Sequence, residues 1–212
     1  MFGPSSAFVL ELVFPSAMSI TPRHVFQAAA RWDVRVVELA LDGGFPVDAA
    51  DKFRNDTLLH CVVASSNPSM HVLVPRMLAA GWDPNAANTY GSTPLLYACI
   101  AGCVDTVRAM VLAGGTLAAV DVDGWTALDY AARTTNPHAW QVLEWLATRP
   151  EVDWWRKPPK HHHALHAIEG TPLEPSIKAR FRAVIEGAMA AQRRWTPLRA
   201  AFVGAAAAAW SV

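Results

Sequence analysis

The chain has 212 residues, of which 52% are hydrophobic and 17% are charged. This composition excludes an intrinsically disordered chain, and the length suits one domain or an elongated array. Eighteen basic and eighteen acidic side chains give a formal net charge of zero, so no overall field draws nucleic acid or an anionic membrane to it. Three cysteines do not form the disulfide framework of a small secreted domain. A reducing, intracellular compartment, cytoplasmic or nuclear, fits them best.

Residues 1–18 contain a short apolar stretch, Ala7 to Leu10, that Glu11 interrupts. No basic residue precedes this stretch, and Pro15 follows it. These features argue against a signal peptide or a membrane span. We expect residues 1–18 to form a segment that caps the open end of the fold behind it.

Residues 19–48 predict a pair of helices. Thr21 is followed by a proline and can start the first helix, and a turn at Trp32 leads into the second. The second helix ends at two glycines, beginning with Gly43.

Residues 52–85 predict a second pair. Thr57 starts its first helix, and Asn55 occupies a turn position where a positive φ is needed, which Asn adopts most readily after Gly. About three extra residues follow Ala64. Because a proline inside a helix removes a hydrogen bond, we expect the second helix to begin near Pro75 or to be kinked there.

Residues 88–120 form the clearest unit. Gly91 lies in a turn, the Thr93 hydroxyl can cap a helix, and Pro94 suits its first position. The small Ala98 lets the first helices of neighbouring units approach closely. A second helix follows, with an apolar face made by Val107, Met110 and Val111.

Shifting this unit by 33 residues lays it on residues 121–153. The coinciding positions are Gly91 on Gly124, Thr93 on Thr126, Leu95 on Leu128 and Ala98 on Ala131. A period of this length indicates a stacked solenoid. The unit at 121–153 is longer by about two residues after Arg133. We expect the particular function of this chain to lie where it departs from the repeat: at this insertion, at the one after Ala64 and beyond Asp153, where the pattern decays.

This pattern resembles the ankyrin repeat. The residues that carry the resemblance are Gly91, Thr93, Pro94, Leu95, Ala98 and Gly102, followed by Val107, Met110, Val111 and Gly114. It is strongest over 88–120 and 121–153, weaker over 19–48 and 52–85, and degenerate beyond 160. The resemblance implies an all-α solenoid of helix-turn-helix units with short β-like turns, an L-shaped section and a concave face. About four repeats are expected, over residues 19–153.

Residues 154–212 are expected to be a helical cap or a degenerate repeat plus a closing helix. The pattern predicts one helix over 176–195, with an apolar stripe, and a separate helix that starts near Pro197. The alternatives are a separate helical appendage and a tail that docks a partner.

Chemical motifs are scarce. A metal site would require more ligands than the tail histidines offer, because no cysteine or carboxylate completes the set of His161, His162, His163 and His166. Cys99 and Cys103 lack CxxC spacing and a paired partner. No phosphate-binding glycine loop, GxSxG or HExxH pattern is present. We therefore expect no catalytic residue, no metal and no cofactor.

The resemblance implies a non-catalytic scaffold or adaptor, because ankyrin partners engage the turn tips and the concave surface of the first helices. Carried onto this chain, those positions are Phe53, Arg54, Asp56, Thr89, Tyr90, Ser92, Ile100, Val122, Asp123, Trp125 and Arg133. Phe53, Tyr90 and Trp125 place an aromatic in or next to three successive turns, and aromatics and arginine dominate binding hot spots. Packing of Trp125 on a neighbouring turn is the alternative. The resemblance also implies a structural role for His60 in the turn network, and packing between repeats for Phe45 and Trp82.

The expected partner is a protein, neither a nucleic acid nor a membrane, and the chain is expected to be a monomeric repeat array or a subunit of a hetero-complex. Two other functions are alternatives. One is a structural subunit of a larger assembly, docked through the tryptophan-rich residues 154–212. The other is a ubiquitin-ligase substrate receptor, because Pro197, Leu198 and Phe202 resemble the first half of a SOCS box, although that family has cysteine at the last of these positions.

Overall fold

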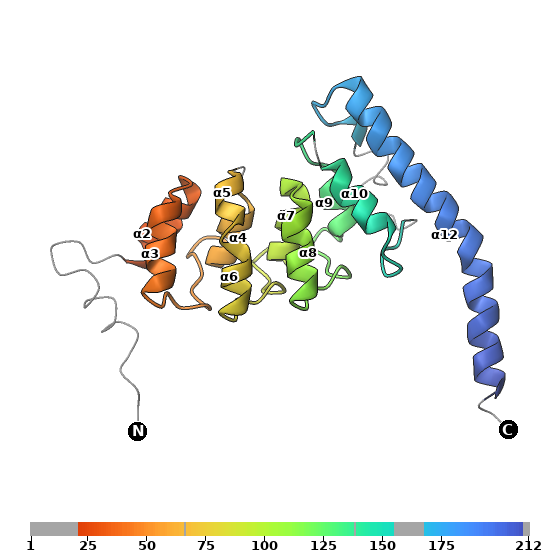
Figure 1. The fold of residues 1–212 in the computed structure, drawn as a ribbon, viewed down its shortest axis with the longest axis horizontal. Coiled ribbons are helices and arrows are strands. Elements are labelled where there is room, and N and C mark those ends of the chain that lie inside the picture. The colour runs from red at the N-terminus through yellow and green to blue at the C-terminus, as the bar shows by residue number, and fades with distance from the viewer. Residues whose placement is uncertain (1–20, 66, 138, 155–167, 210–212) are drawn as a thin grey trace.

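The computed structural model describes residues 21–65, 67–137, 139–154 and 168–209, and for 195–209 it describes the backbone. Within these ranges the chain forms helices and no strand; an isolated bridge joins Ala50 to Thr57. Helix pairs follow one another along the described chain (Figure 1): α2 (Pro22–Ala30) with α3 (Val34–Asp42), α4 (Leu58–Val63) with α6 (Val74–Ala79), α7 (Pro94–Ala101) with α8 (Val104–Leu112), and α9 (Ala127–Ala132) with α10 (Trp140–Ala147). A one-turn helix, α5 (Pro68–His71), precedes α6, and a long helix, α12 (Pro175–Ala209), follows the pairs.

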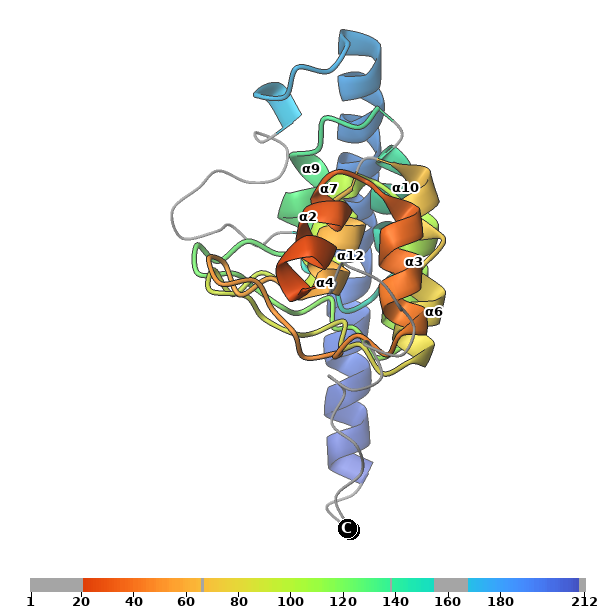
Figure 2. The same cartoon turned by 90° about the vertical axis from the view of Figure 1, so that its left-hand side faces the viewer.

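The pairs stack in two columns. The inner column contains α2, α4, α7 and α9, each in contact with the next, and α8 contacts both α6 and α10 in the outer column. Figure 2 looks along the stack and shows the inner and outer helices side by side, with the turns between successive pairs projecting beyond the inner helices. The predicted all-α repeat solenoid is confirmed.

The inner helices begin at the predicted threonines. Thr21, Thr57, Thr93 and Thr126 are all extended N-cap residues, so a hydroxyl is available for the first orphan N–H groups. The turn before each of the last three helices contains a residue with positive φ: Asn55 at 58°, Gly91 at 70° and Gly124 at 81°. The prediction that Asn55 replaces glycine in this conformation is confirmed.

One continuous hydrophobic core runs from Val25 in α2 to Ala188 in α12. Leu95 and Leu96 of α7 are fully buried, and so are the small residues Ala98 and Ala131 on neighbouring inner helices. A helix pair covers only part of its apolar surface by itself, so this core belongs to the interfaces between pairs.

Phe45 and Trp82 strengthen the first of these interfaces. Their rings stack with centroids 6.3 Å apart and an interplanar angle of 3°, and Phe26 meets Phe45 edge-on at 6.1 Å. Both side chains are buried. The predicted packing role of these two aromatics is confirmed.

The extra residues after Ala64 form α5 and the turn that follows it. Helix α6 then begins at Val74, so Pro75 lies in its first turn, where a missing N–H removes no helical hydrogen bond. The prediction that the helix begins near Pro75 is confirmed. Val72 ends α5 with 75% of its surface exposed, so it takes no part in the core.

Helix α12 covers the last pair. Its first half packs on α10 and buries Phe181 and Ile185. The Gln192 side chain accepts a hydrogen bond from the Trp154 N–H at 3.1 Å and donates one to the Val152 carbonyl at 3.0 Å. The predicted break at Pro197 is wrong, because one helix runs through it. Figure 1 shows α12 changing direction part-way along, as a proline inside a helix produces.

No helix in the described ranges has both the length and the apolar character needed to cross a bilayer. The expected N-terminal cap, residues 1–18, lies outside the described residues, as does the connection 155–167.

Replacing Trp82 by alanine should lower the free energy of unfolding by about 3–5 kcal/mol, because it removes a buried aromatic and leaves a cavity beside Phe45. Urea unfolding followed by circular dichroism measures this change. The control is Leu112→Ala on the outer face, where 89% of the side chain is already exposed; it should alter stability by less than about 0.5 kcal/mol. Equal effects of the two substitutions would contradict the packing role of Trp82.

Candidate functional site

The turns that project from the stack are held by a polar residue at the start of each. The Asn88 Oδ1 atom accepts hydrogen bonds from the backbone N–H groups of Tyr90, at 2.9 Å, and Ser92, at 3.0 Å. Asp121 Oδ1 does the same for Asp123 and Trp125, both at 2.9 Å. Such side-chain contacts replace the backbone pairs of a regular hairpin and fix the shape of a short turn.

Backbone hydrogen bonds then join each turn to the next. The Thr89 N–H donates to the Arg54 carbonyl at 2.8 Å, and the Val122 N–H donates to the Tyr90 carbonyl at 2.9 Å. The Thr89 hydroxyl adds a bond to the same Arg54 carbonyl at 3.0 Å. The turns of the second, third and fourth pairs therefore form one connected edge.

Apolar side chains stand on this edge in solvent. Phe53 is 94% exposed, Tyr90 is 52% exposed and Val122 is 63% exposed. Arg54 and Thr89 are exposed beside them. The structure thus brings together, on adjacent turns, five of the residues predicted for binding. We call Phe53, Tyr90 and Val122 the tip row.

Two predicted site residues do not lie on this surface. Asp56 and Ser92 are 6% and 3% exposed. The Asn88 side-chain amide donates to Asp56 Oδ1 at 2.7 Å, and the Ser92 hydroxyl shares a hydrogen bond with the Tyr130 hydroxyl at 2.7 Å. Their predicted exposure is wrong, because both side chains point toward the next repeat and hold it in register.

Trp125 also packs inward. Its ring meets Tyr130 edge-on with centroids 5.9 Å apart, and the Arg133 guanidinium lies 4.0 Å above its face. A cation over an aromatic face is attracted by the ring quadrupole. Trp125 and Asp123 are half-buried, so the packing alternative for Trp125 is the one that the structure supports.

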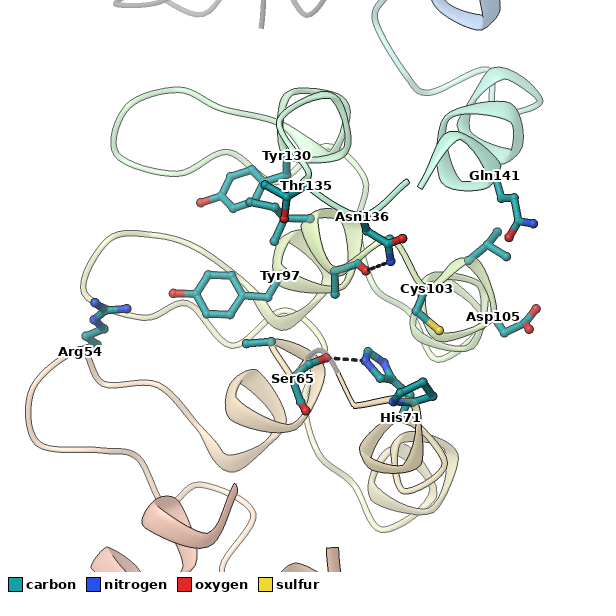
Figure 3. Close-up of a pocket in the computed structure, with 16 residues that line it drawn as sticks. Arg54, Ser65, His71, Tyr97, Cys103, Asp105, Tyr130, Thr135, Asn136 and Gln141 are labelled. Atoms are coloured by element: carbon teal, nitrogen blue, oxygen red, sulfur yellow. Dashed lines mark hydrogen bonds between the residues drawn. The ribbon is translucent and has the colours of Figure 1, made fainter. Parts of the chain in front are cut away.

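Behind the tip row lies a groove of about 830 Å³. Its lining includes Arg54, Tyr97, Ile100 and Tyr130, and Figure 3 shows the two tyrosines on neighbouring inner helices. Ile100, a predicted site residue, is 37% exposed here. The groove continues the surface of the tip row onto the inner helices.

The two tyrosines were missed from sequence. Tyr97 and Tyr130 each precede the small alanine of their unit, and that shared position was the available signal. Tyr97 Oη accepts a hydrogen bond from the Asn88 amide at 3.1 Å, and Tyr130 Oη donates to Asp121 Oδ2 at 3.0 Å. Burial raises the pKa of both hydroxyls above the ordinary tyrosine value of 10.0, so they remain hydrogen-bond donors well above neutral pH.

His60 connects the start of α4 to the turn of the next helix pair. Its Nδ1 atom accepts a hydrogen bond from the Thr57 N–H at 3.0 Å, and Nε2 donates to the Ser92 carbonyl at 3.1 Å. The ring is fully buried, and burial lowers the pKa of His60. A neutral ring satisfies both contacts, which is the structural role predicted for it.

Comparison with known families agrees with this geometry. The family model of ankyrin repeats in three copies matches residues 25–116 and 62–157, together more than half of the chain. The chain is an ankyrin-repeat protein. Ankyrin repeats generally mediate protein–protein interaction, and the described fold belongs to that class of binding module.

One curated relative shares part of the sequence. Over 103 residues the chain is 35% identical to the glycerophosphocholine phosphodiesterase gde1 of Schizosaccharomyces pombe, a match that covers 47% of the chain and 8% of the relative. The chain therefore spans less than a tenth of that protein. A match to so small a part does not carry the enzymatic activity over to this ankyrin-repeat protein.

The described residues were also compared with the arrangement that a metal site requires. Among those residues, no group of three or more His, Cys, Asp or Glu is placed to hold a metal ion. The tail histidines at 161–163 and 166 lie outside the described part of the chain.

Replacing His60 by glutamine should reduce the amount by which the stability against unfolding falls as the pH is lowered. Because the folded pKa of His60 lies below its ordinary value of 6.5, the unfolded chain binds a proton more readily than the folded one. The resulting stability is fully present above pH 6.5 and is lost as the pH falls from there through the folded pKa. Urea midpoints measured from about pH 8 to about pH 5 should fall less for His60→Gln than for the wild type.

The matched control is His24→Gln. His24 occupies the same position of the first inner helix, next to Thr21, but is exposed. This variant shows what the change from histidine to glutamine does at an exposed site of the same kind, and its urea midpoint near pH 8 should stay close to that of the wild type. A profile in which His60→Gln is as steep as the wild type would show that His60 does not limit stability in acid.

Proposed function

We propose that this ankyrin-repeat protein is a non-catalytic scaffold or adaptor that binds a protein partner across the tip row and the adjoining groove. The observation that carries the proposal is the exposure of Phe53, Tyr90 and Val122 on turns that are hydrogen-bonded to one another. Exposed apolar side chains held on a rigid edge suit a partner that covers them.

The rigid edge favours binding because the backbone of the turns is already ordered before a partner binds. The polar residues at the start of each turn and the bonds between turns already hold the backbone. Association then loses less conformational entropy than it would with mobile loops. Phe53 and Tyr90 offer large apolar surfaces, and the exposed Arg54 follows Phe53 directly in the sequence. Aromatic residues and arginine are the residue types that dominate binding hot spots.

The groove adds residues of the inner helices to the proposed binding surface. Ile100 and Tyr97 line it on α7, and Tyr130 lines it on α9. A partner segment that crosses the tip row would reach these residues next. The predicted residues Asp56, Ser92 and Trp125 contribute indirectly, because they support the turns from inside.

The free thiols of Cys61, Cys99 and Cys103 suit the reducing, intracellular compartment that we propose for this protein. For the two alternative functions, the described residues add no support. Trp154, the described tryptophan at the start of residues 154–212, is only 2% exposed and packs within the chain. The SOCS-like residues lie in a part of α12 whose side chains are not described.

The test is the double substitution Phe53→Ala with Tyr90→Ala in the full chain. Partners captured by affinity purification from cells are identified by mass spectrometry, produced separately and titrated against both proteins. We expect at least about a tenfold loss of affinity, because each of these side chains would lose its buried contact. The urea midpoint should stay unchanged, since both side chains are exposed.

The matched control removes two exposed leucines from the outer helices, Leu39→Ala with Leu112→Ala. It should leave affinity unchanged. An equal loss in both double variants, or undiminished binding by the tip-row variant, would show that the partner uses another surface. Point substitutions are preferable to removal of α12, because that helix covers the apolar face of α10.

A further inference from the structure

A thiol and an imidazole from different repeats meet at the far rim of the groove. Helix α5 places His71 against the start of α8, where Cys103 and Thr106 lie. Figure 3 shows the His71 and Cys103 side chains among the residues that line the groove. His71 Nε2 lies 2.9 Å from the Ser65 carbonyl, His71 Nδ1 lies 3.0 Å from the Thr106 hydroxyl, and that hydroxyl lies 3.1 Å from Cys103 Sγ. The three side chains form a continuous path from sulfur to imidazole.

The Ser65 carbonyl sets the tautomer of this imidazole. A carbonyl can only accept, so Nε2 carries the hydrogen and Nδ1 is left as the acceptor in the neutral ring. In that state the thiol can donate to the Thr106 oxygen while the Thr106 hydroxyl donates to Nδ1. After proton transfer the directions reverse: Nδ1–H donates to the Thr106 oxygen, and the hydroxyl donates to the thiolate. Every hydrogen bond is satisfied on both sides of the transfer.

We propose that Cys103 is the reactive thiol of this chain and a modification site that forms mixed disulfides with small disulfide molecules, with His71 accepting its proton through Thr106. The site requires a nucleophile, a base in reach of it and room for the adduct. Cys103 and His71 supply the first two, and the groove that both of them line supplies the third.

The surroundings favour the state in which Cys103 is a thiolate and His71 is an imidazolium. The interaction with His71, helped by Thr106, outweighs burial and lowers the pKa of Cys103 to about 7. Burial by itself lowers the pKa of His71, but the contacts with Cys103 and the Ser65 carbonyl outweigh it and raise the pKa. Asp105 and Arg108, the charged residues of α8 nearest in sequence, are exposed and pair with each other at 3.6 Å.

The other two cysteines have the opposite surroundings. Burial raises the pKa of Cys61 and of Cys99 to about 12 each, so both stay as thiols near neutral pH. The thiolate is the nucleophilic form of cysteine, so Cys103 is the activated cysteine of the chain. Cys61 and Cys99 serve as unreactive controls within the same molecule.

The reaction balances without a further reagent. The Cys103 thiolate attacks one sulfur of a small disulfide, so a new S–S bond forms as the old S–S bond breaks. The leaving thiolate takes up a proton, which the His71 imidazolium can return through Thr106. Cys103 is oxidised to the mixed disulfide, and half of the small disulfide is reduced to a thiol.

The experiment uses the full chain and two probes. Iodoacetamide labelling, quenched at intervals and read by peptide mass spectrometry, gives a rate for each cysteine between about pH 5.5 and about pH 9. We expect Cys103 to be labelled at least about tenfold faster than Cys61 or Cys99 near pH 7, with a half-maximal rate near that pH. Oxidised glutathione should then add to Cys103 alone, and a Cys103→Ser chain should take up none.

Substitutions of the path test the roles of its members. Thr106→Val removes the hydroxyl and should move the pH midpoint of Cys103 labelling upward by about one unit, toward an ordinary thiol, and so should His71→Asn. Thr106→Ser keeps the hydroxyl and should restore the midpoint, which separates the relay from a packing effect. Equal labelling of the three cysteines, or a wild-type midpoint above about pH 8.5, would overturn the proposal. A Thr106→Ser chain that behaves like Thr106→Val would also overturn it.

Discussion

The interface between successive helix pairs is the constraint on which the rest of this structure depends. Each pair leaves an apolar side that it cannot cover alone, so Leu95 and Leu96 of α7 reach full burial only between α4 and α9. The small Ala98 on the same helix allows the close approach. The same constraint explains α12, because no further helix pair follows α10 in the described residues, and α12 packs on α10 there and buries Phe181.

The stacking also builds the binding surface. Neighbouring inner helices set the distance between their turns, and that distance lets the Thr89 N–H reach the Arg54 carbonyl. Buried polar groups then select one register, because Asp56 must meet the Asn88 amide and an unpaired carboxylate inside the fold would be costly. Exposure of the tip row thus follows from burial behind it. The same polar groups that stabilise the stack present the apolar side chains to solvent.

Much of the fold could be predicted from the sequence, because many of its features depend on nearby residues. Features that depend on a neighbouring repeat could not be predicted in this way. The threonine caps and the positive φ of Asn55 are local, since each depends on residues a few positions away, and the period of 33 residues is read directly by laying the sequence on itself. The direction of Asp56 and Ser92 depends on the repeat that follows, and periodicity carries no information about it. The length of α12 is not local either, because Pro197 predicts a helix start in the sequence although one helix continues through it in the fold.

The two insertions that interrupt the period meet at one groove. The first forms α5 and brings Ser65 and His71 to its rim. The second, after Arg133, folds back on α7, where the Asn136 amide donates to the Ala101 carbonyl at 2.8 Å. Gly102 permits this approach, because a Cβ at that position would lie 2.6 Å from the Ala139 side chain. Regular repeats would give a smooth concave face, so the two insertions give this groove the walls and the polar groups that distinguish it within the stack.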